Sequence, residues 1–315
     1  MKLIFGLFLL ILVTPSIAQD MGYAYPLKYH SFYSQQQKLT MAYTYEKASK
    51  ENGKTVLLLH GKNFSGTYWN QTIKLLLQNG FNVLVPDQIG FGVSDMPQRY
   101  QYSFQQLAAN TKALADSLGI SKLIVLGHSM GGMLAVRFAL QYAEFCSQLI
   151  LENPIGLEDW KIWVPYSPID IEYKKELSKT LASLKKYFLD NYFHGQWKNE
   201  YDSLLYYSSR NLSNKAAAWN MALTSDMIFT QPVCYEFASI KVPTVLMIGL
   251  LDRTAIGKER VDSITASRMG NYPMLGKKVS DLIPGCKLIE LNGIGHIPHV
   301  EDFGGFSKKL LEVLK

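Results

Sequence analysis

The sequence of 315 residues contains only three cysteines, and they are widely spaced: Cys146, Cys234 and Cys286. An odd number of distant cysteines does not make a disulfide framework, and at most one bridge can form. The spacing also matches neither a Cys–His pair nor a set of metal ligands. We therefore expect small buried apolar side chains at these positions, and we predict neither a metal nor a cofactor.

Runs of a single charge are missing as well. The formal net charge is +6, but the basic residues are scattered among acidic ones. Proteins that bind nucleic acid usually concentrate Lys and Arg in blocks or patches, so the sequence argues against such a partner. There is no internal repeat and no low-complexity tract. Hydrophobic residues make up 48% of the chain, which suffices for a sizeable globular core.

The one long apolar run lies at the N-terminus, over residues 3–13. A lysine precedes it, Pro15 ends it, and small residues lead to Ala18, in the pattern of a cleaved secretory signal. The run is shorter than the about 20 residues that span a bilayer, so a retained membrane anchor is the less favoured alternative. The sequence predicts a signal peptide over residues 1–18, export to the periplasm or the extracellular space, and no stable membrane insertion after cleavage.

Buried strands alternate with helices through the first half of the chain. "TVLLLHG", "FNVLVPD" and "KLIVLGHS" are continuous apolar runs bounded by turn residues, and each is followed by apolar residues at helical spacing. Such runs suit strands covered on both faces, and their alternation with helices favours parallel βαβ units. Before them, residues 27–34 and 38–46 form a predicted hairpin. The fold class is therefore α/β.

This alternation stops after Pro154. Residues 155–235 have helical patterns, no convincing buried strand, and four of the five tryptophans. Strands resume with "VPTVLMIGLLD" and "CKLIELNGIGH". We predict one α/β domain made of residues 19–154 and 236–315, with a helical, aromatic-rich cap over residues 155–235.

The segment "GHSMG" carries the first chemical signal. Ser129 lies in a G-x-S-x-G pattern between a predicted strand and a predicted helix, the setting of a nucleophile elbow. A tight turn strains the serine backbone, and neighbours without Cβ atoms let strand and helix approach. The hydroxyl then stands at the carboxyl edge of the sheet, beside the free N–H groups of a helix. A helix N-cap is the alternative, but this context favours a nucleophile.

A serine hydroxyl needs a base to take its proton. His296 lies in the loop after the last predicted strand, at the same edge of the sheet as Ser129, and is preferred over His299. His128 adjoins Ser129, but its side chain should diverge from that of the serine on this turn. His60 is more plausibly a support for the turn that follows its own strand.

The base in turn needs a carboxylate to orient it and to stabilise the imidazolium. Asp252 follows a buried strand and lies between the serine and the histidine in sequence, the order found in α/β-hydrolases. Glu152 and Asp159, which follow the preceding strand, are the alternatives. The alternative for Asp252 is a purely structural role, as a turn residue paired with Arg253.

Backbone donors should stabilise the tetrahedral oxyanion. One is the N–H of Met130, immediately after the nucleophile. The other is the N–H of Lys62, with Asn63 as the alternative, in the turn after "LLLHG". The Lys62 side chain either is exposed or meets an anionic group of the substrate.

Together, "LLLHGKNFSG", "VPDQIGFGVSD", "VLGHSMGG", "LENPIGLEDW", "GLLDRT" and "GIGHIPHVED" make the chain resemble the α/β-hydrolase superfamily. The resemblance implies an eight-stranded, mostly parallel sheet, a helical cap after the sixth strand, and Ser129, Asp252 and His296 as nucleophile, acid and base. A serine at the elbow argues against haloalkane dehalogenases and epoxide hydrolases, which have aspartate there. The segment between Asp252 and His296 is longer than is common in the family.

These observations predict an exported serine hydrolase that cleaves carboxylic esters of hydrophobic or aryl small molecules through an acyl-enzyme. The aromatic cap is expected to wall an apolar pocket for the substrate, although many of its rings should simply pack on the core. One alternative is hydrolysis of a carbon–carbon bond, as in ring-cleavage-product hydrolases, which share the S-M-G-G elbow. Another is a ligand-binding protein that kept the fold without the activity.

Overall fold

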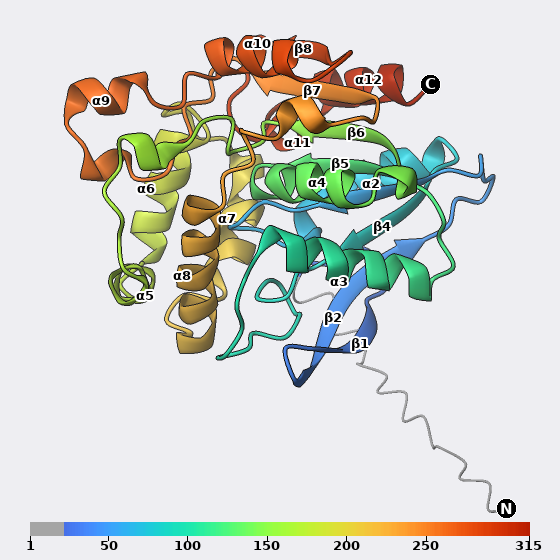
Figure 1. Cartoon of the computed structure of the whole chain (residues 1–315), viewed down its shortest axis with the longest axis horizontal. Helices are drawn as coiled ribbons and strands as arrows, with labels where there is room; N and C mark the ends of the chain where they lie inside the picture. The colour runs from blue at the N-terminus through green and yellow to red at the C-terminus, as the bar shows by residue number, and fades with distance from the viewer. Residues whose placement is uncertain (1–21) are drawn as a thin grey trace, which may run out of the picture.

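The computed structural model describes residues 22–315, in which an eight-stranded sheet is flanked by helices (Figure 1). The strand order is β1-β2-β4-β3-β5-β6-β7-β8. The strands are β1 (Lys28–Ser34), β2 (Gln37–Glu46), β3 (Thr55–Leu59), β4 (Asn82–Pro86), β5 (Leu123–His128), β6 (Cys146–Glu152), β7 (Thr244–Gly249) and β8 (Lys287–Leu291). β1 and β2 form the expected antiparallel hairpin, β2 is also antiparallel to β4, and the other neighbours are parallel. The predicted mostly parallel sheet is confirmed; the predicted signal peptide lies outside the described residues.

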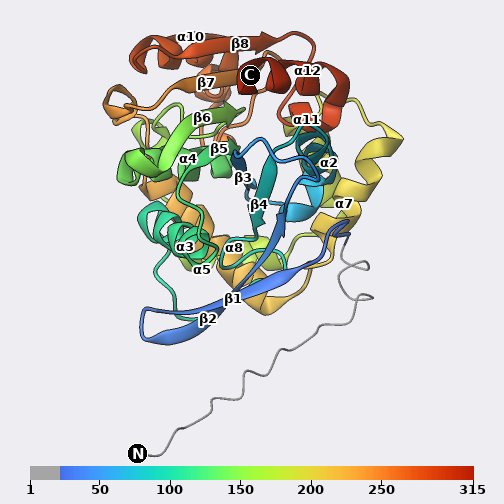
Figure 2. The same cartoon turned by 90° about the vertical axis from the view of Figure 1, so that its right-hand side faces the viewer.

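Helices cover both faces of the sheet. α3 (Phe104–Ser117), α4 (Met130–Gln141) and α10 (Tyr272–Leu282) pack on one face, and α2 (Asn70–Gln78) and α12 (Phe303–Leu314) pack on the other. Figure 2 shows α3 and α4 on one side of the strands and α2 and α12 on the opposite side. Because side chains of a strand alternate between faces, Leu57 and Leu59 enter one core cluster while Val56 and Leu58 enter the other. The continuous apolar runs in the sequence thus reflect burial on both faces.

Four helices lie between β6 and β7: α5 (Ile169–Leu177), α6 (Leu181–Asn191), α7 (Asp202–Ser209) and α8 (Lys215–Thr230). Figure 1 shows them gathered at one end of the sheet. Rings of this segment, including Phe188 and Tyr192, form a third apolar cluster with Phe64 and Ile297 of the core domain. Most cap aromatics in this cluster therefore attach the cap to the core.

The long segment between Asp252 and His296 consists largely of regular secondary structure. It contains α9 (Ser263–Arg268), α10 and β8, and α11 (Pro298–Glu301) follows the histidine. Short 3₁₀ turns complete the fold: η1 (Gly66–Trp69), η2 (Ala143–Phe145), η3 (Trp160–Ile162), η4 (Asn199–Tyr201), η5 (Phe237–Ser239) and η6 (Lys258–Arg260). The three cysteines are all free thiols. Within residues 22–315, no helix is both long enough and apolar enough to cross a bilayer.

Candidate active site

Ser129 forms a sharp turn between β5 and α4, with φ of 56° and ψ of −122°. This is a strained conformation for a residue with a side chain. Its flanking glycines are required by close packing. A Cβ on Gly127 would lie 2.1 Å from the Gly131 carbonyl oxygen, and one on Gly131 would lie 2.1 Å from the Leu59 carbonyl oxygen. Any side chain at either position would force the turn apart.

The structure brings Ser129, His296 and Asp252 into one chain of hydrogen bonds. The Ser129 hydroxyl lies 3.0 Å from His296 Nε2, and His296 Nδ1 lies 2.6 Å from Asp252 Oδ2. All three side chains are buried, and Ser129 is only 5% exposed. With Nδ1–H donating to the carboxylate, Nε2 is left to accept the serine proton. The arrangement can therefore activate the hydroxyl as a nucleophile.

Asp252 is held by more than the histidine. Its carboxylate also accepts hydrogen bonds from Asn153 Nδ2 at 2.8 Å and from the Thr254 N–H at 2.8 Å. Burial by itself would raise the pKa of Asp252, but His296 and these two donors outweigh it and lower the pKa. The Asn153 amide oxygen accepts from the Gly249 N–H at 2.9 Å, which ties the ends of β6 and β7 together. Sequence reasoning missed Asn153, although a polar residue directly after a buried strand was a visible signal.

His128 stabilises the loop that carries the base instead of contacting the nucleophile. Its Nε2–H donates to the His296 carbonyl oxygen at 2.8 Å, and its Nδ1 accepts from the Tyr68 hydroxyl at 3.0 Å. The same hydroxyl accepts from the Gly61 N–H at 2.8 Å. Burial and the neighbouring His296 lower the pKa of His128 to about 3, so the ring is neutral. His60 likewise supports its turn, with contacts to the Gly61 carbonyl oxygen and to the Gln88 N–H.

Glu301 fixes the same loop from its other side. Its carboxylate accepts from the Gly295 N–H at 2.9 Å and from the Ile297 N–H at 2.8 Å, the residues on either side of His296. Burial raises the pKa of Glu301 to about 7. Tyr192 of the cap stacks on the His296 ring, with centroids 4.7 Å apart, and its carbonyl oxygen accepts from the His296 N–H at 3.1 Å. The sequence pattern had assigned no role to either residue.

The alternative acid and base pair with each other. Glu152 Oε1 accepts from the His299 N–H at 2.9 Å and from His299 Nδ1 at 2.8 Å. Burial raises the pKa of Glu152 to about 7. Among the described residues, Glu152 Oε2 and His299 Nε2 have no hydrogen-bond partner. Asp159 caps the short η3 turn, where it accepts from the Lys161 N–H at 3.0 Å.

The two predicted oxyanion donors belong to Met130, which follows Ser129, and to Lys62, which follows a glycine packed against Ser129. Met130 is the first residue of α4, where the N–H lacks an acceptor within the helix. Gly61 packs directly against Ser129, because a Cβ at that glycine would lie 3.2 Å from the Ser129 Cβ. The Lys62 N–H comes next in this turn. The Lys62 side chain is only 15% exposed and pairs with Glu176 of the cap, so of the two alternatives for this side chain the exposed lysine is wrong.

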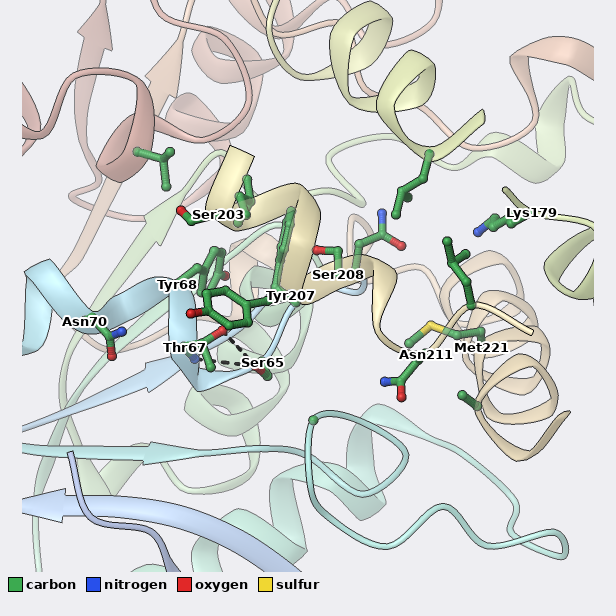
Figure 3. Close-up of a pocket in the computed structure, with 18 of the residues that line it drawn as sticks. Ser65, Thr67, Tyr68, Asn70, Lys179, Ser203, Tyr207, Ser208, Asn211 and Met221 are labelled. Atoms are coloured by element: carbon green, nitrogen blue, oxygen red, sulfur yellow. Dashed lines mark hydrogen bonds between the residues drawn. The ribbon is translucent and has the colours of Figure 1, made fainter. Parts of the chain in front are cut away.

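Two cavities lie between the cap and the core, with volumes of about 280 and 540 Å³. Asn63, Glu176, Lys179 and Leu184 line both of them. Figure 3 shows the smaller cavity, with Tyr207 in its middle. Nine charged side chains are among the residues that line the larger cavity, although more of its surface is apolar than polar. Ser129 is among the lining residues of neither cavity.

Within residues 22–315, no group of three or more His, Cys, Asp or Glu side chains is arranged to hold a metal ion.

Comparisons with known proteins agree with this fold. A family model for the alpha/beta hydrolase fold matches residues 54–188. The crystal structure of a "probable hydrolytic enzyme" from Pseudomonas aeruginosa PAO1 superposes with a TM-score of 0.91 and 45% identity, covering 93% of this chain and 95% of that one. Lipase 3 from Moraxella sp. (strain TA144) is 26% identical over 264 residues, which are 82% of this chain and 76% of the lipase.

Other matches cover less of the chain. A 2-hydroxy-6-oxo-6-phenylhexa-2,4-dienoate hydrolase from Burkholderia cepacia is 29% identical over 161 residues, 47% of this chain and 56% of that protein. Uncharacterized mycobacterial proteins are 37% identical over 106 residues, and this match spans only 30% of their length. The full-length structural match, the sheet order and the elbow show that the chain belongs to the α/β-hydrolase superfamily.

Proposed function

We propose that this protein is a serine hydrolase that cleaves carboxylic esters through an acyl-enzyme on Ser129. The observation that carries the proposal is the unbroken chain of hydrogen bonds from Ser129 through His296 to Asp252. A serine hydroxyl hydrogen-bonded to an imidazole, which is itself oriented by a buried carboxylate, is the arrangement that acyl transfer requires.

In the first half of the reaction, Ser129 Oγ attacks the ester carbonyl carbon while His296 Nε2 takes the hydroxyl proton. The lowered pKa keeps Asp252 ionised, so that it stabilises the imidazolium. The negative oxygen of the tetrahedral intermediate accepts from the Met130 and Lys62 N–H groups. The intermediate collapses, His296 returns the proton to the departing alcohol, and the acyl group stays on Ser129.

In the second half, a water molecule attacks the acyl carbon and His296 accepts its proton. The same two N–H groups hold the second oxyanion, and its collapse releases the acid and restores the Ser129 hydroxyl. His128 and Glu301 act on both halves by holding the His296 loop, through its carbonyl oxygen and through the flanking N–H groups. They are positioning residues, since the hydrogen bonds of their side chains go to the His296 loop and to Tyr68 and not to the Ser129 hydroxyl.

The second candidate is hydrolysis of a carbon–carbon bond in a vinylogous diketone. Similarity to the Burkholderia cepacia hydrolase favours it. Export, which the N-terminal pattern of residues 1–18 predicts, argues for the ester instead, because ring-cleavage products arise inside the cell. We therefore propose an exported esterase, and mass spectrometry of the secreted protein should find a mature N-terminus after Ala18.

The test compares p-nitrophenyl butyrate with a vinylogous diketone as substrates of the purified protein and of Ser129→Ala. We expect release of p-nitrophenol that Ser129→Ala abolishes, and slow or no cleavage of the diketone. Preferred cleavage of the diketone would establish the second candidate. Turnover of neither substrate by a folded protein, or undiminished turnover by Ser129→Ala, would overturn the proposed serine hydrolase.

A further inference from the structure

Three charged side chains meet where the turn after β3 contacts the cap. Lys62 Nζ lies 3.2 Å from Glu176 Oε1, and Lys179 Nζ lies 2.5 Å from Glu176 Oε2. Glu176 belongs to α5, and Lys179 lies in the connection from α5 to α6. The side chains of Lys62 and Glu176 are 15% and 8% exposed, and that of Lys179 is 28% exposed. One carboxylate therefore bridges two ammonium groups in a largely desolvated place.

The cluster carries one positive charge more than it can neutralise internally. Burial opposes ionisation of Glu176, but Lys62 and Lys179 outweigh it and lower its pKa to about 2. Burial and the neighbouring Lys62 lower the pKa of Lys179. Removing charges from water is costly unless each has a partner, so an unbalanced cluster favours the arrival of an anion.

Other charged groups around the larger cavity already have partners. Lys175 lies 2.5 Å from Glu259, and Arg260 lies 4.0 Å from Glu172. Lys258 donates to the Arg253 carbonyl oxygen. Asp226, which accepts from the Tyr166 hydroxyl, offsets Lys258 in charge, so the formal surplus of one positive charge around the larger cavity lies at Lys62 and Lys179.

The position of the cluster links it to the reacting atoms. Lys62 follows Gly61, which packs against Ser129, and its side chain lines the larger cavity. Lys179 and Glu176 line both cavities. In Figure 3 the Lys179 nitrogen points into the smaller cavity from the side opposite Asn70. A substrate whose ester carbonyl meets the Lys62 N–H would thus extend past the two ammonium groups.

We propose that Lys62 and Lys179 form an anion subsite for a carboxylate group of the substrate, so that the natural substrate is an ester that also carries a free acid. In the absence of substrate, Glu176 holds the two lysines in place, and the substrate carboxylate adds to or displaces it. This inference rests on the proposed ester hydrolysis at Ser129 and refines its substrate from a purely hydrophobic ester to an acidic one.

The experiment uses three methyl esters of the same chain length with a different group at the far end: monomethyl adipate, methyl hexanoate and methyl 6-aminohexanoate. Each is measured as a competitor of p-nitrophenyl butyrate hydrolysis at neutral pH, which yields an inhibition constant whether or not the methyl ester is turned over. We expect monomethyl adipate to bind at least about tenfold more tightly than methyl hexanoate, since a charge-assisted contact in a desolvated site contributes that much. The cationic ester should bind most weakly.

Two variants separate recognition from a merely structural ion pair. Lys179→Gln should remove the preference for monomethyl adipate and leave binding of methyl hexanoate within about twofold. Glu176→Gln should increase the preference, because it frees both lysines for the ligand. Lys186→Gln is the matched control, since this lysine of α6 is 76% exposed, pairs with Asp190 and lines neither cavity. It should change nothing.

If these ion pairs only held the cap on the core, Lys179→Gln and Glu176→Gln would instead weaken the binding of all three esters alike. Equal or weaker binding of monomethyl adipate by the wild-type protein would also overturn the anion subsite while leaving ester hydrolysis intact. Failure to hydrolyse p-nitrophenyl butyrate in a Ser129-dependent manner would instead overturn the proposed function itself.

Discussion

The structure contains two buried histidine–carboxylate pairs whose histidines lie three residues apart along the chain, and of these two pairs only that of His296 reaches the Ser129 hydroxyl. His296 Nδ1 lies 2.6 Å from Asp252, and its other nitrogen lies 3.0 Å from the Ser129 hydroxyl. His299 Nδ1 lies 2.8 Å from Glu152, and its other nitrogen has no partner among the described residues.

The carboxylates differ as much as the histidines. Asp252 accepts from His296, Asn153 and Thr254, and its pKa is lowered despite burial. One oxygen of Glu152 has no donor within the described chain, and burial raises the pKa of Glu152 to about 7. A histidine beside a buried acid is therefore not sufficient for catalysis. The acid must be held ionised by further donors, and the far nitrogen must face the group that reacts.

The largest expected effect separates the two histidines. His296→Gln removes the base and should lower kcat by several orders of magnitude, because triad members act as a unit. His299→Gln should keep kcat within about tenfold of the wild-type value. Steady-state hydrolysis of p-nitrophenyl butyrate measures both, with circular dichroism as the check on folding. A larger loss in His299→Gln would reverse the assignment of the base.

The next effect separates the two acids. Asp252→Asn leaves the side chain in place but removes its charge and favours the wrong tautomer of His296, so kcat should fall by roughly 10³- to 10⁴-fold. Glu152→Gln keeps an oxygen for both hydrogen bonds from His299 and should change kcat less than about threefold. Similar losses in the two variants would mean that Glu152 takes part in the proton transfer.

A smaller effect is expected at Asn153, which donates a hydrogen bond to Asp252. Asn153 has φ of 37°, so Asn153→Gly removes the amide without straining the backbone. Loss of the bond to Asp252 should lower kcat about tenfold and destabilise the fold by roughly 1–3 kcal/mol, the cost of a lost hydrogen bond to a buried charge. Kinetics and urea unfolding measure the two changes. Wild-type values for both would show that Asn153 does not hold Asp252.

The smallest effect on activity is expected for Glu152→Gln, which should instead change how the free energy of unfolding depends on pH. The pKa of Glu152 is about 7 in the folded protein and about 4.5 in an exposed carboxyl, so the folded state binds its proton more tightly. Its contribution to stability is full below about pH 4.5 and is lost as the pH rises through 7. Glu152→Gln should remove this pH-dependent loss of stability, which is on the order of 1–3 kcal/mol between pH 5 and 7.5. Urea unfolding at the two pH values measures it, and an unchanged pH dependence would contradict the raised pKa.

The sequence allowed prediction of the fold and of the three residues that meet at the candidate site, because both depend on local patterns. Continuous apolar runs identified the doubly covered strands, and the positions after β5, β7 and β8 placed Ser129, Asp252 and His296 at one edge. The longer segment after Asp252 caused no displacement, since it folds as helices outside the strand order.

Residues that position other residues were not predictable in the same way. Glu301 acts through two backbone N–H groups, and Tyr192 through stacking and a carbonyl oxygen, and such contacts require no motif. The contact between Lys62 and Glu176 joins residues 114 positions apart, so it depends on how the cap lies on the core. The sequence showed that the cap is rich in aromatic residues. It did not show that these rings pack together, or that charged side chains lie around the larger cavity.

The most direct test of the central claim is reaction with a fluorophosphonate, followed by intact mass and peptide mapping. The wild-type protein should gain one adduct, located on Ser129, at a rate that His296→Gln lowers by at least about 100-fold and His299→Gln leaves nearly unchanged. Adduct formation on another residue, or a labelling rate that depends on His299 rather than on His296, would contradict the account.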